Sequence, residues 1–311
     1  MARSKVLFAK AKLERLEKEA SLTYRFRKLL EESSLKDMIS SGNLVAIKIH
    51  VGDMEHDGYR TIRPIFIRIL VDYVKKLGGI PFLIDTWGLR HVVVGLENGY
   101  NYAAVGAPLI PVSGIKETDL IKVKVPNPLK LSEVEVGSAV YHADVLINFA
   151  HSKGHPSPGY GGAIKNLAMG CTSPNTRPAI HNLEKEDNSG KTFQEGMIDA
   201  VHAVILNKPN KVFHINYVMD VQPTCDCAPW SDIPIIPDIG ILASEDIVAL
   251  EKATLDIINQ APIVPGSIGE AAGLKPGDNK FQVIHGKDPY IQVEAGYRKG
   301  LGNLGYELIE V

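Results

Sequence analysis

The strongest constraint on the fold is a strand–helix–strand pattern in the first third of the chain. Residues 44–50 form a short apolar run of the kind that is buried in a parallel sheet. A helix is predicted to open at Arg63-Pro64, since proline suits a first helical turn, and to stop at Gly78-Gly79. A second apolar run at residues 80–84 follows. This βαβ pattern predicts parallel strands joined by a right-handed crossover.

Two further apolar runs, at residues 144–150 and 211–218, extend the same pattern. We therefore expect an α/β fold, Rossmann-like, with mostly parallel sheet and helices on both faces. Residues 1–311 are expected to form a single unit, with an alternative of two lobes at 1–143 and 144–311. In that alternative the site lies between the lobes, and the C-terminal tail packs back.

Several other segments have patterns that predict their secondary structure. Residues 8–40 are expected to form one or two amphipathic helices, and residues 193–207 a further helix. A helix capped by Ser244 is expected to run to Gln260. The tail from residue 281 to 311 is expected to form strand, helix and strand, with Val283-Ile284 in its first strand.

Composition excludes some classes of function. The 311 residues have a formal net charge of -2, which argues against a general nucleic-acid binder. No run approaches the roughly 20 apolar residues that cross a bilayer, so no membrane partner is expected. The charged amino terminus is not followed by the apolar segment of a signal peptide. We expect a cytoplasmic protein, in which thiols stay reduced.

Cysteines are few, and two of them are almost adjacent. Cys225-Asp226-Cys227 follows the apolar run at residues 211–218. Two thiols one residue apart rarely form a good disulfide with each other, so a soft metal is their natural partner. We predict that Cys171, the remaining cysteine, joins them around a metal or an iron–sulfur cluster. The alternative is three ordinary cysteines that pack as small hydrophobic residues.

Polar side chains follow the predicted strands at the edge where parallel sheets bind ligands. His50, Asp53 and His56 come after the first strand, and Asp85 comes after the second. The cysteine pair follows a later strand of the same sheet. We therefore predict that these residues mark one functional rim.

A glycine-rich stretch follows the strand at residues 144–150. Gly161 and Gly162 leave backbone N–H groups free to approach an anion, and a helix that begins near Gly162 would direct its amino end at that anion. Lys153, Lys165 and His155 add positive charge. The stretch is predicted to bind a small anionic ligand.

The sequence resembles the domain-of-unknown-function-362 family, whose members are often labelled iron–sulfur or ferredoxin-like proteins. The resemblance rests on residues 45–52, 85–86, 148–155, 159–171, 193–195, 225–227 and 238–244, together with His181. Many relatives have a dicluster ferredoxin insertion after the position of His181, but residues 182–192 here contain no cysteine. Clusters of the ferredoxin kind are therefore not expected. The resemblance implies the fold and the site more than a reaction.

Residues 159–170 also have a fainter similarity to nickel-pincer lactate racemases, in which a glycine-rich turn precedes a functional lysine. The lysine that corresponds here is Lys165.

The first functional hypothesis is a [4Fe–4S] protein, expected to be an enzyme, with cluster ligands Cys171, Cys225 and Cys227. The fourth iron is open or ligated by His181 or His155. Lys153 and Lys165 would bind an anion, and His155 would act as acid or base. Further predicted ligand-binding residues are Gly161, Gly162, Asn166, His50 and Asp85.

Two alternatives stay open. One is a single zinc or iron ion held by the three thiolates, with or without a histidine. The other is a metal-free, lyase- or racemase-like ligand-binding module in which Lys165 is the working residue. A homodimer and a redox partner protein are further candidate partners.

Overall fold

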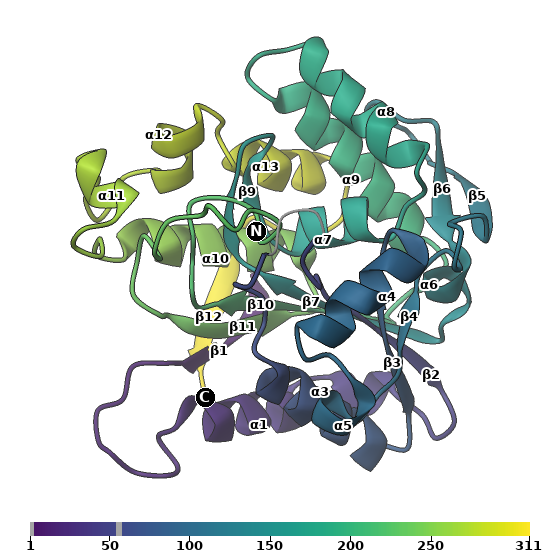
Figure 1. The fold of residues 1–311 in the computed structure, drawn as a ribbon, viewed down its shortest axis with the longest axis horizontal. Helices are drawn as coiled ribbons and strands as arrows, with labels where there is room; N and C mark the ends of the chain where they lie inside the picture. The colour runs from purple at the N-terminus through teal and green to yellow at the C-terminus, as the bar shows by residue number, and fades with distance from the viewer. Residues whose placement is uncertain (1–2, 54–57) are drawn as a thin grey trace.

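The computed structural model describes residues 3–53 and 58–311, and an eight-stranded sheet forms its centre (Figure 1). The strand order is β12-β1-β11-β10-β7-β2-β3-β4. The strands are β1 (Ser4–Lys10), β2 (Leu44–Lys48), β3 (Ile80–Asp85), β4 (Leu109–Pro111), β7 (Val145–His151), β10 (Val212–Val218), β11 (Gly240–Ser244) and β12 (Tyr306–Glu310). Within this sheet β11 is antiparallel to both its neighbours, and the other pairings are parallel.

Helices cover both faces of the sheet (Figure 1). One face carries α1 (Leu22–Glu32), α2 (Leu35–Met38), α3 (Pro64–Lys76) and α5 (Tyr102–Val105). The other carries α7 (Ala163–Gly170), α9 (Lys191–Ile205), α10 (Ile247–Gln260) and α13 (Tyr290–Arg298). The predicted α/β class, with a mostly parallel sheet, is confirmed.

The remaining elements complete the described part of the chain. They are α4 (Gly88–Glu97), α6 (Ser138–His142), α8 (Thr176–Asn182), the 3₁₀ helix η1 (Leu183–Lys185), α11 (Ile268–Ala271), α12 (Lys280–His285) and the two-stranded pairs β5 (Leu120–Lys124) with β6 (Glu133–Gly137) and β8 (Lys153–His155) with β9 (Gly159–Gly161). Across the described part of the chain, no helix combines the length and apolar character that a bilayer crossing requires.

Strand β7 shows why the sheet has two cores. Its side chains alternate between the two faces, as in any strand. Ile147 and Phe149 pack with the α1 and α3 layer, whereas Leu146 and Ala150 pack with the α7 and α9 layer. Both faces are therefore apolar, which is why the run lacks the polar alternation of a half-exposed strand.

Three local predictions are only partly right. Residues 8–40 do contain two helices, α1 and α2, but residues 8–10 lie in β1, where Phe8 is buried, and Leu16 is 97% exposed in the following loop. Val283-Ile284 lies in α12 rather than in a strand. The N-cap of α10 is Asp246, whose side chain accepts a hydrogen bond from the Ala249 amide.

The sheet topology places the site. Strands β3 and β4 extend from β2 on one side, whereas β7 and β10 extend from it on the other. In open α/β sheets a ligand crevice forms at such a switch point, beyond the carboxyl ends of the strands. His50 follows β2, Asp85 ends β3, Lys153 follows β7 and Cys225 follows β10.

Candidate functional site

A cavity of about 570 Å³ lies at this edge of the sheet. Its volume is within the range of small-molecule sites. The described residues that line it are Lys48, His50, Asp53, Asp85, Thr86, Trp87, His91, Lys153, His155, Gly161, Gly162, Lys165, Asn166, Met169, Gly170, Pro174, Arg177, Pro178, His181, Cys225 and Cys227. The predicted rim and the glycine-rich stretch thus meet in one cavity. His56, also predicted for the rim, lies outside the described residues.

Three potential metal ligands converge inside the cavity. Nε2 of His50 lies 3.3 Å from Sγ of Cys227 and 4.0 Å from Sγ of Cys225. The three ligand atoms all lie within 4.8 Å of one another. A tetrahedral ion with bonds of about 2.0–2.3 Å to nitrogen and sulfur has ligand–ligand edges of roughly 3.3–3.8 Å. The donor set therefore fits a thiophilic ion with little rearrangement.

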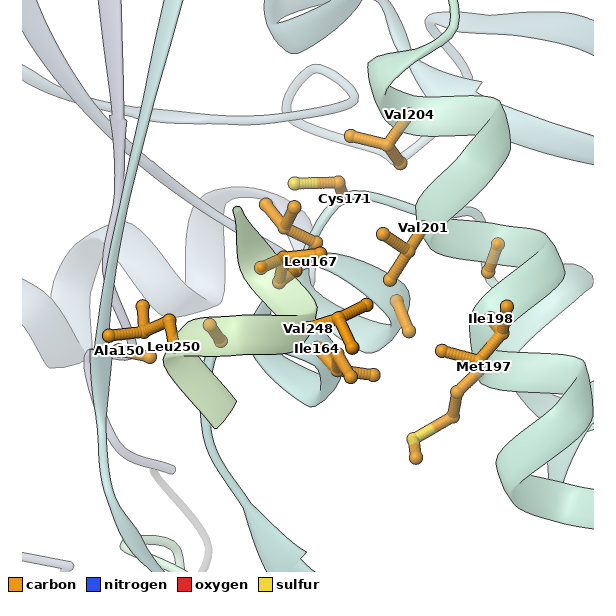
Figure 2. Packing of buried hydrophobic residues seen from close by; sticks show 14 of the residues in the cluster. Ala150, Ile164, Leu167, Cys171, Met197, Ile198, Val201, Val204, Val248 and Leu250 are labelled. Carbon is orange, nitrogen blue, oxygen red and sulfur yellow. The ribbon is translucent and has the colours of Figure 1, made fainter. Parts of the chain in front are cut away.

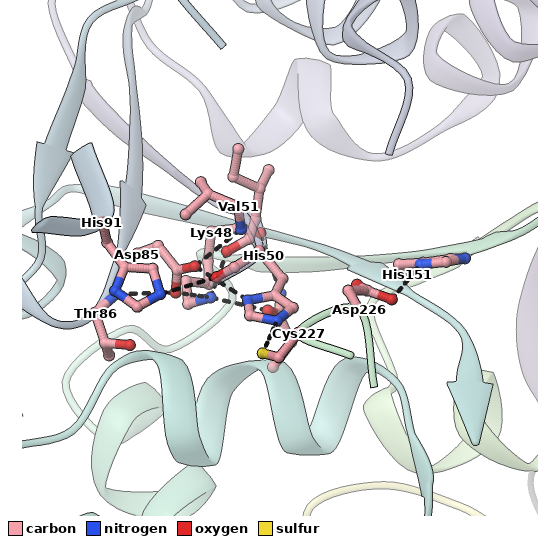
Figure 3. A network of polar contacts seen from close by, with 12 residues as sticks. Lys48, His50, Val51, Asp85, Thr86, His91, His151, Asp226 and Cys227 are labelled. Carbon is pink, nitrogen blue, oxygen red and sulfur yellow. Dashed lines mark hydrogen bonds and ion pairs between the residues drawn. The ribbon is translucent and has the colours of Figure 1, made fainter. Parts of the chain in front are cut away.

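Asp85 orients the His50 ring (Figure 3). Its Oδ2 lies 3.2 Å from His50 Nδ1 and accepts a hydrogen bond of 3.0 Å from the Val51 amide. Its Oδ1 lies 2.8 Å from Lys48 Nζ, and both side chains of that ion pair are buried. A carboxylate on one imidazole nitrogen leaves the other free for a metal, as at many metal sites.

The charges of Asp85 and His50 follow from the same contacts. Burial alone would raise the pKa of Asp85, but the Lys48 ammonium and His50 hold that pKa well below its usual value. For His50, burial lowers the pKa, but hydrogen bonds with Asp85 and Cys225 outweigh this and raise it to about 9. A metal ion would compete with the proton on this ring.

The two thiols share one proton. Hydrogen bonds from Cys227, His155 and His50 lower the pKa of Cys225 despite burial, so Cys225 is the thiolate. The hydrogen bond between Cys225 and Cys227, burial, and the negative charge of Cys225 all raise the pKa of Cys227. A bound ion would displace the shared proton and bring both sulfurs to the thiolate form.

Asp226 fixes the loop that presents the two thiols. Its buried carboxylate accepts three hydrogen bonds of 2.8 Å, from His151 Nδ1, Lys153 Nζ and Gln222 Nε2. Burial raises its pKa, but His151 and Lys153 together lower it below the usual value. Because the carboxylate between the cysteines is anchored to β7 and β8, the flanking thiols have defined positions.

The two predicted lysines differ in their pairing. Lys153 is neutralised by Asp226. Lys165, on the first turn of α7, has no hydrogen bond or ion pair to any residue in the described ranges. Burial lowers the pKa of Lys165, while the nearby Cys225 raises it. Lys165 is therefore the cavity cation that is available to an anionic ligand.

The amino end of α7 is not available for the ligand, contrary to the prediction. The Ala163 amide donates to Oε1 of Glu251, a buried residue of α10, at 2.7 Å. The glycine before it is required by this packing, since a Cβ on Gly162 would lie 2.3 Å from Tyr160 Oη and 2.5 Å from Glu251 Oε1. Gly162 thus allows the close approach of α10 rather than the close approach of an anion.

His155 and Asn166 both line the cavity, as predicted for ligand contact. Nδ1 of His155 accepts a 3.1 Å hydrogen bond from the Ser157 amide, so the neutral ring carries its proton on Nε2. Burial lowers the pKa of His155 to about 4, which keeps it neutral at pH 7. Asn166 donates to Asn148 Oδ1 at 2.7 Å and accepts from Lys48 Nζ at 2.8 Å.

Cys171 does not join the other two thiols, so the predicted site of three cysteines is corrected on this point. Its side chain has no exposed surface and belongs to the apolar core between α7 and α9, beside Leu167 and Val201 (Figure 2). Burial raises its pKa to about 12. Cys171 ends α7 on the face that packs inward, whereas Lys165 lies on the cavity side.

His181 lines the cavity but lies outside the group of potential metal ligands. Its side chain is 47% exposed, and Nδ1 lies 2.6 Å from Glu184 Oε1. Its ring packs against Phe193 with centroids 5.2 Å apart. His181 therefore lies on the solvent side of the cavity and is not positioned to be the fourth metal ligand.

The charged and aromatic cavity residues that sequence reasoning missed are Lys48, Trp87, His91 and Arg177. Lys48 did carry a signal, because it is the charged residue within the apolar run of β2 and a buried charge needs a partner. Arg177 carried none, since its place in the cavity depends on how α8 folds back.

Comparisons with known proteins identify the family, and one solved structure shares the fold. Residues 45–256 match the profile of a family described as "Domain of unknown function (DUF362)". The lactate racemase apoprotein from Thermoanaerobacterium thermosaccharolyticum superposes with a TM-score of 0.54 and 14% sequence identity, over 99% of this chain and 83% of that chain. A Thermotoga maritima protein from the Northeast Structural Genomics Consortium has a TM-score of 0.45 and 12% identity, over 66% of this chain and 51% of that chain. No curated protein matches the chain.

Proposed function

The chain belongs to the DUF362 family, and we propose that it is a metal-dependent enzyme in which His50, Cys225 and Cys227 bind a single zinc or iron ion. The observation that carries this proposal is the convergence of three donor atoms within 4.8 Å inside a cavity of about 570 Å³. Soft thiolates with an imidazole suit a thiophilic ion. Three protein ligands also leave one position of a tetrahedral ion open, as in catalytic zinc sites.

A small anionic ligand fits the rest of the cavity. Among the described residues of the cavity, Lys165 is the unpaired cation, and the neutral His155 can donate a hydrogen bond from Nε2. When bound, the ion would supply Lewis-acid chemistry at the open position. The lactate racemase that shares this fold is named for a small carboxylate, which supports an anionic ligand here.

The [4Fe–4S] cluster predicted from the sequence is the second candidate for the cofactor. It needs a third protein ligand beside Cys225 and Cys227, and with Cys171 in the apolar core that ligand would be His50. Spacings of 3.3 and 4.0 Å between donors favour a single ion, because a cluster separates its ligands more widely.

Elemental analysis after anaerobic purification tests the proposal. We expect about one zinc or iron per chain and no acid-labile sulfide. Cys225→Ser, Cys227→Ser and His50→Ala should each lose the metal, whereas Cys171→Ser is the matched control and should retain it. Four irons with sulfide would select the cluster. Metal-free protein that cannot be reconstituted would overturn the metal site and leave the racemase-like, metal-free module with Lys165.

A further inference from the structure

On the solvent side of the cavity lie two aromatic rings, Trp87 and His91, which the proposed metal site does not use. We call this pair the aromatic lip. Trp87 is 42% exposed, and its ring packs edge-on against the His91 ring with centroids 4.7 Å apart. The guanidinium carbon of Arg177 lies 5.9 Å from the centre of the Trp87 ring. All three residues line the same cavity as Lys165.

The backbone holds Trp87 in an unusual conformation. Its φ of 65° and ψ of 32° are left-handed, a region that costs a bulky side chain about 1–2 kcal/mol. Gly88 is also left-handed, with φ 64°, and a Cβ there would lie 2.5 Å from the Ile115 carbonyl oxygen. The Trp87 amide donates to Glu117 Oε1 at 3.2 Å. Strained conformations of this kind persist where the surroundings fix them, often at ligand-binding sites.

The charge of Arg177 is already neutralised by an ion pair with Glu117. Its Nη2 lies 2.8 Å from Glu117 Oε1, and its Nη1 donates to the Thr172 carbonyl oxygen at 2.6 Å. Arg177 therefore supports the indole ring from one side through a cation–π contact rather than offering a second anion site. Among the described cavity residues, the unpaired cation remains Lys165, while the exposed part of Trp87 offers an apolar planar surface.

We propose that the cavity binds aromatic carboxylates, with the carboxylate on Lys165 and the planar ring against Trp87. This inference deepens the proposed function and rests on the part of it in which Lys165 binds an anion. A cavity of about 570 Å³ has room for a ring in addition to an acid group. Offset or edge-to-face contact with indole favours a planar aromatic ring over a saturated ring of similar size.

Calorimetric titration with benzoate, cyclohexanecarboxylate and acetate tests the inference on the metal-loaded protein. We expect benzoate to bind about tenfold more tightly than cyclohexanecarboxylate, and acetate most weakly. Trp87→Gly keeps the left-handed backbone without a side chain, and it should lower benzoate affinity about tenfold while leaving acetate affinity unchanged. Trp87→Phe should restore most of the benzoate affinity.

Fluorescence gives an independent readout. The chain has 2 tryptophans, so Trp230→Phe leaves Trp87 as the reporter, and benzoate but not acetate should quench it. Benzoate binding that depends on Lys165 but not on Trp87 would overturn the aromatic lip and leave the proposed function standing. Absence of binding for all three acids would overturn both the aromatic lip and the anion site.

Discussion

Oδ2 of Asp85 lies 3.2 Å from Nδ1 of His50, and the opposite ring nitrogen of His50 lies 3.3 Å from Cys227 Sγ. Asp85 ends β3 and His50 follows β2, so the parallel pairing of these strands brings the two residues together. The relationship links the buried Lys48–Asp85 ion pair to the proposed ion through a single imidazole.

Replacing Asp85 should therefore weaken metal binding without removing a ligand. Asp85→Asn loses the carboxylate that sets the His50 tautomer, and comparable substitutions reduce metal affinity about 10–100-fold. Competition with a chromophoric chelator measures the zinc affinity of each variant. Lys48→Met is the matched control, because it breaks the same buried ion pair but keeps the Asp85–His50 contact. An equal loss in both variants would assign the effect to general destabilisation instead.

The three cysteines should differ sharply toward an alkylating reagent. In the metal-free native protein, Cys225 and Cys227 are half-buried at the cavity, whereas Cys171 is fully buried with its pKa raised to about 12. Since the thiolate is the reactive form, Cys225 should be modified first, Cys227 more slowly because its pKa is raised, and Cys171 only after unfolding in urea. Mass spectrometry of digested protein identifies the sites. Native modification of Cys171 at the rate of the other two would contradict its place in the core.

The sheet was more predictable than the site. Runs such as residues 144–150 are apolar on both faces, and a strand buried in this way leaves a continuous pattern in the sequence. Strand β1 was missed because Ser4–Lys10 pairs with β11 and β12, which lie far away in the chain. Local patterns contain no trace of such a partner.

The residues of the site also divide into those with a local sequence signal and those whose position depends on distant segments. The sheet rule placed His50, Asp85 and Cys225 at one edge, because each follows a recognisable strand. It failed for Cys171, since residue type does not tell which side of a helix faces the cavity. Trp87 was missed because its left-handed backbone depends on contacts with the loop around Ile115.

Glu251 should give the fold a measurable pH dependence. Burial raises its pKa from 4.5 to about 7, despite hydrogen bonds from Asn216 and the Ala163 amide. The folded state thus holds this proton more tightly than the unfolded state, so the contribution to stability is full below about pH 4.5 and falls as pH rises to about 7. The loss amounts to at most about 3 kcal/mol.

Urea denaturation of wild type and Glu251→Gln between pH 4.5 and 8 measures this contribution. The amide does not titrate, so the stability of wild type relative to the variant should fall across the window and level off above it. A difference that stays constant with pH would show that Glu251 is ionised throughout. Metal is kept saturating for both proteins, so that the titration of the cavity residues cancels.

Two neighbouring glycines should respond very differently to alanine. A Cβ on Gly162 would lie 2.3 Å from Tyr160 Oη and 2.5 Å from Glu251 Oε1, so Gly162→Ala must displace the start of α7 and with it Lys165. We expect a loss of stability of about 1–3 kcal/mol from this overpacking, together with weaker benzoate binding. A Cβ on Gly161 would meet nothing closer than Lys165 Cδ at 3.5 Å, an ordinary contact, so Gly161→Ala is the matched control. Urea midpoints and calorimetric titration measure both effects, and equal behaviour of the two variants would mean that α10 does not pack against the turn as closely as described.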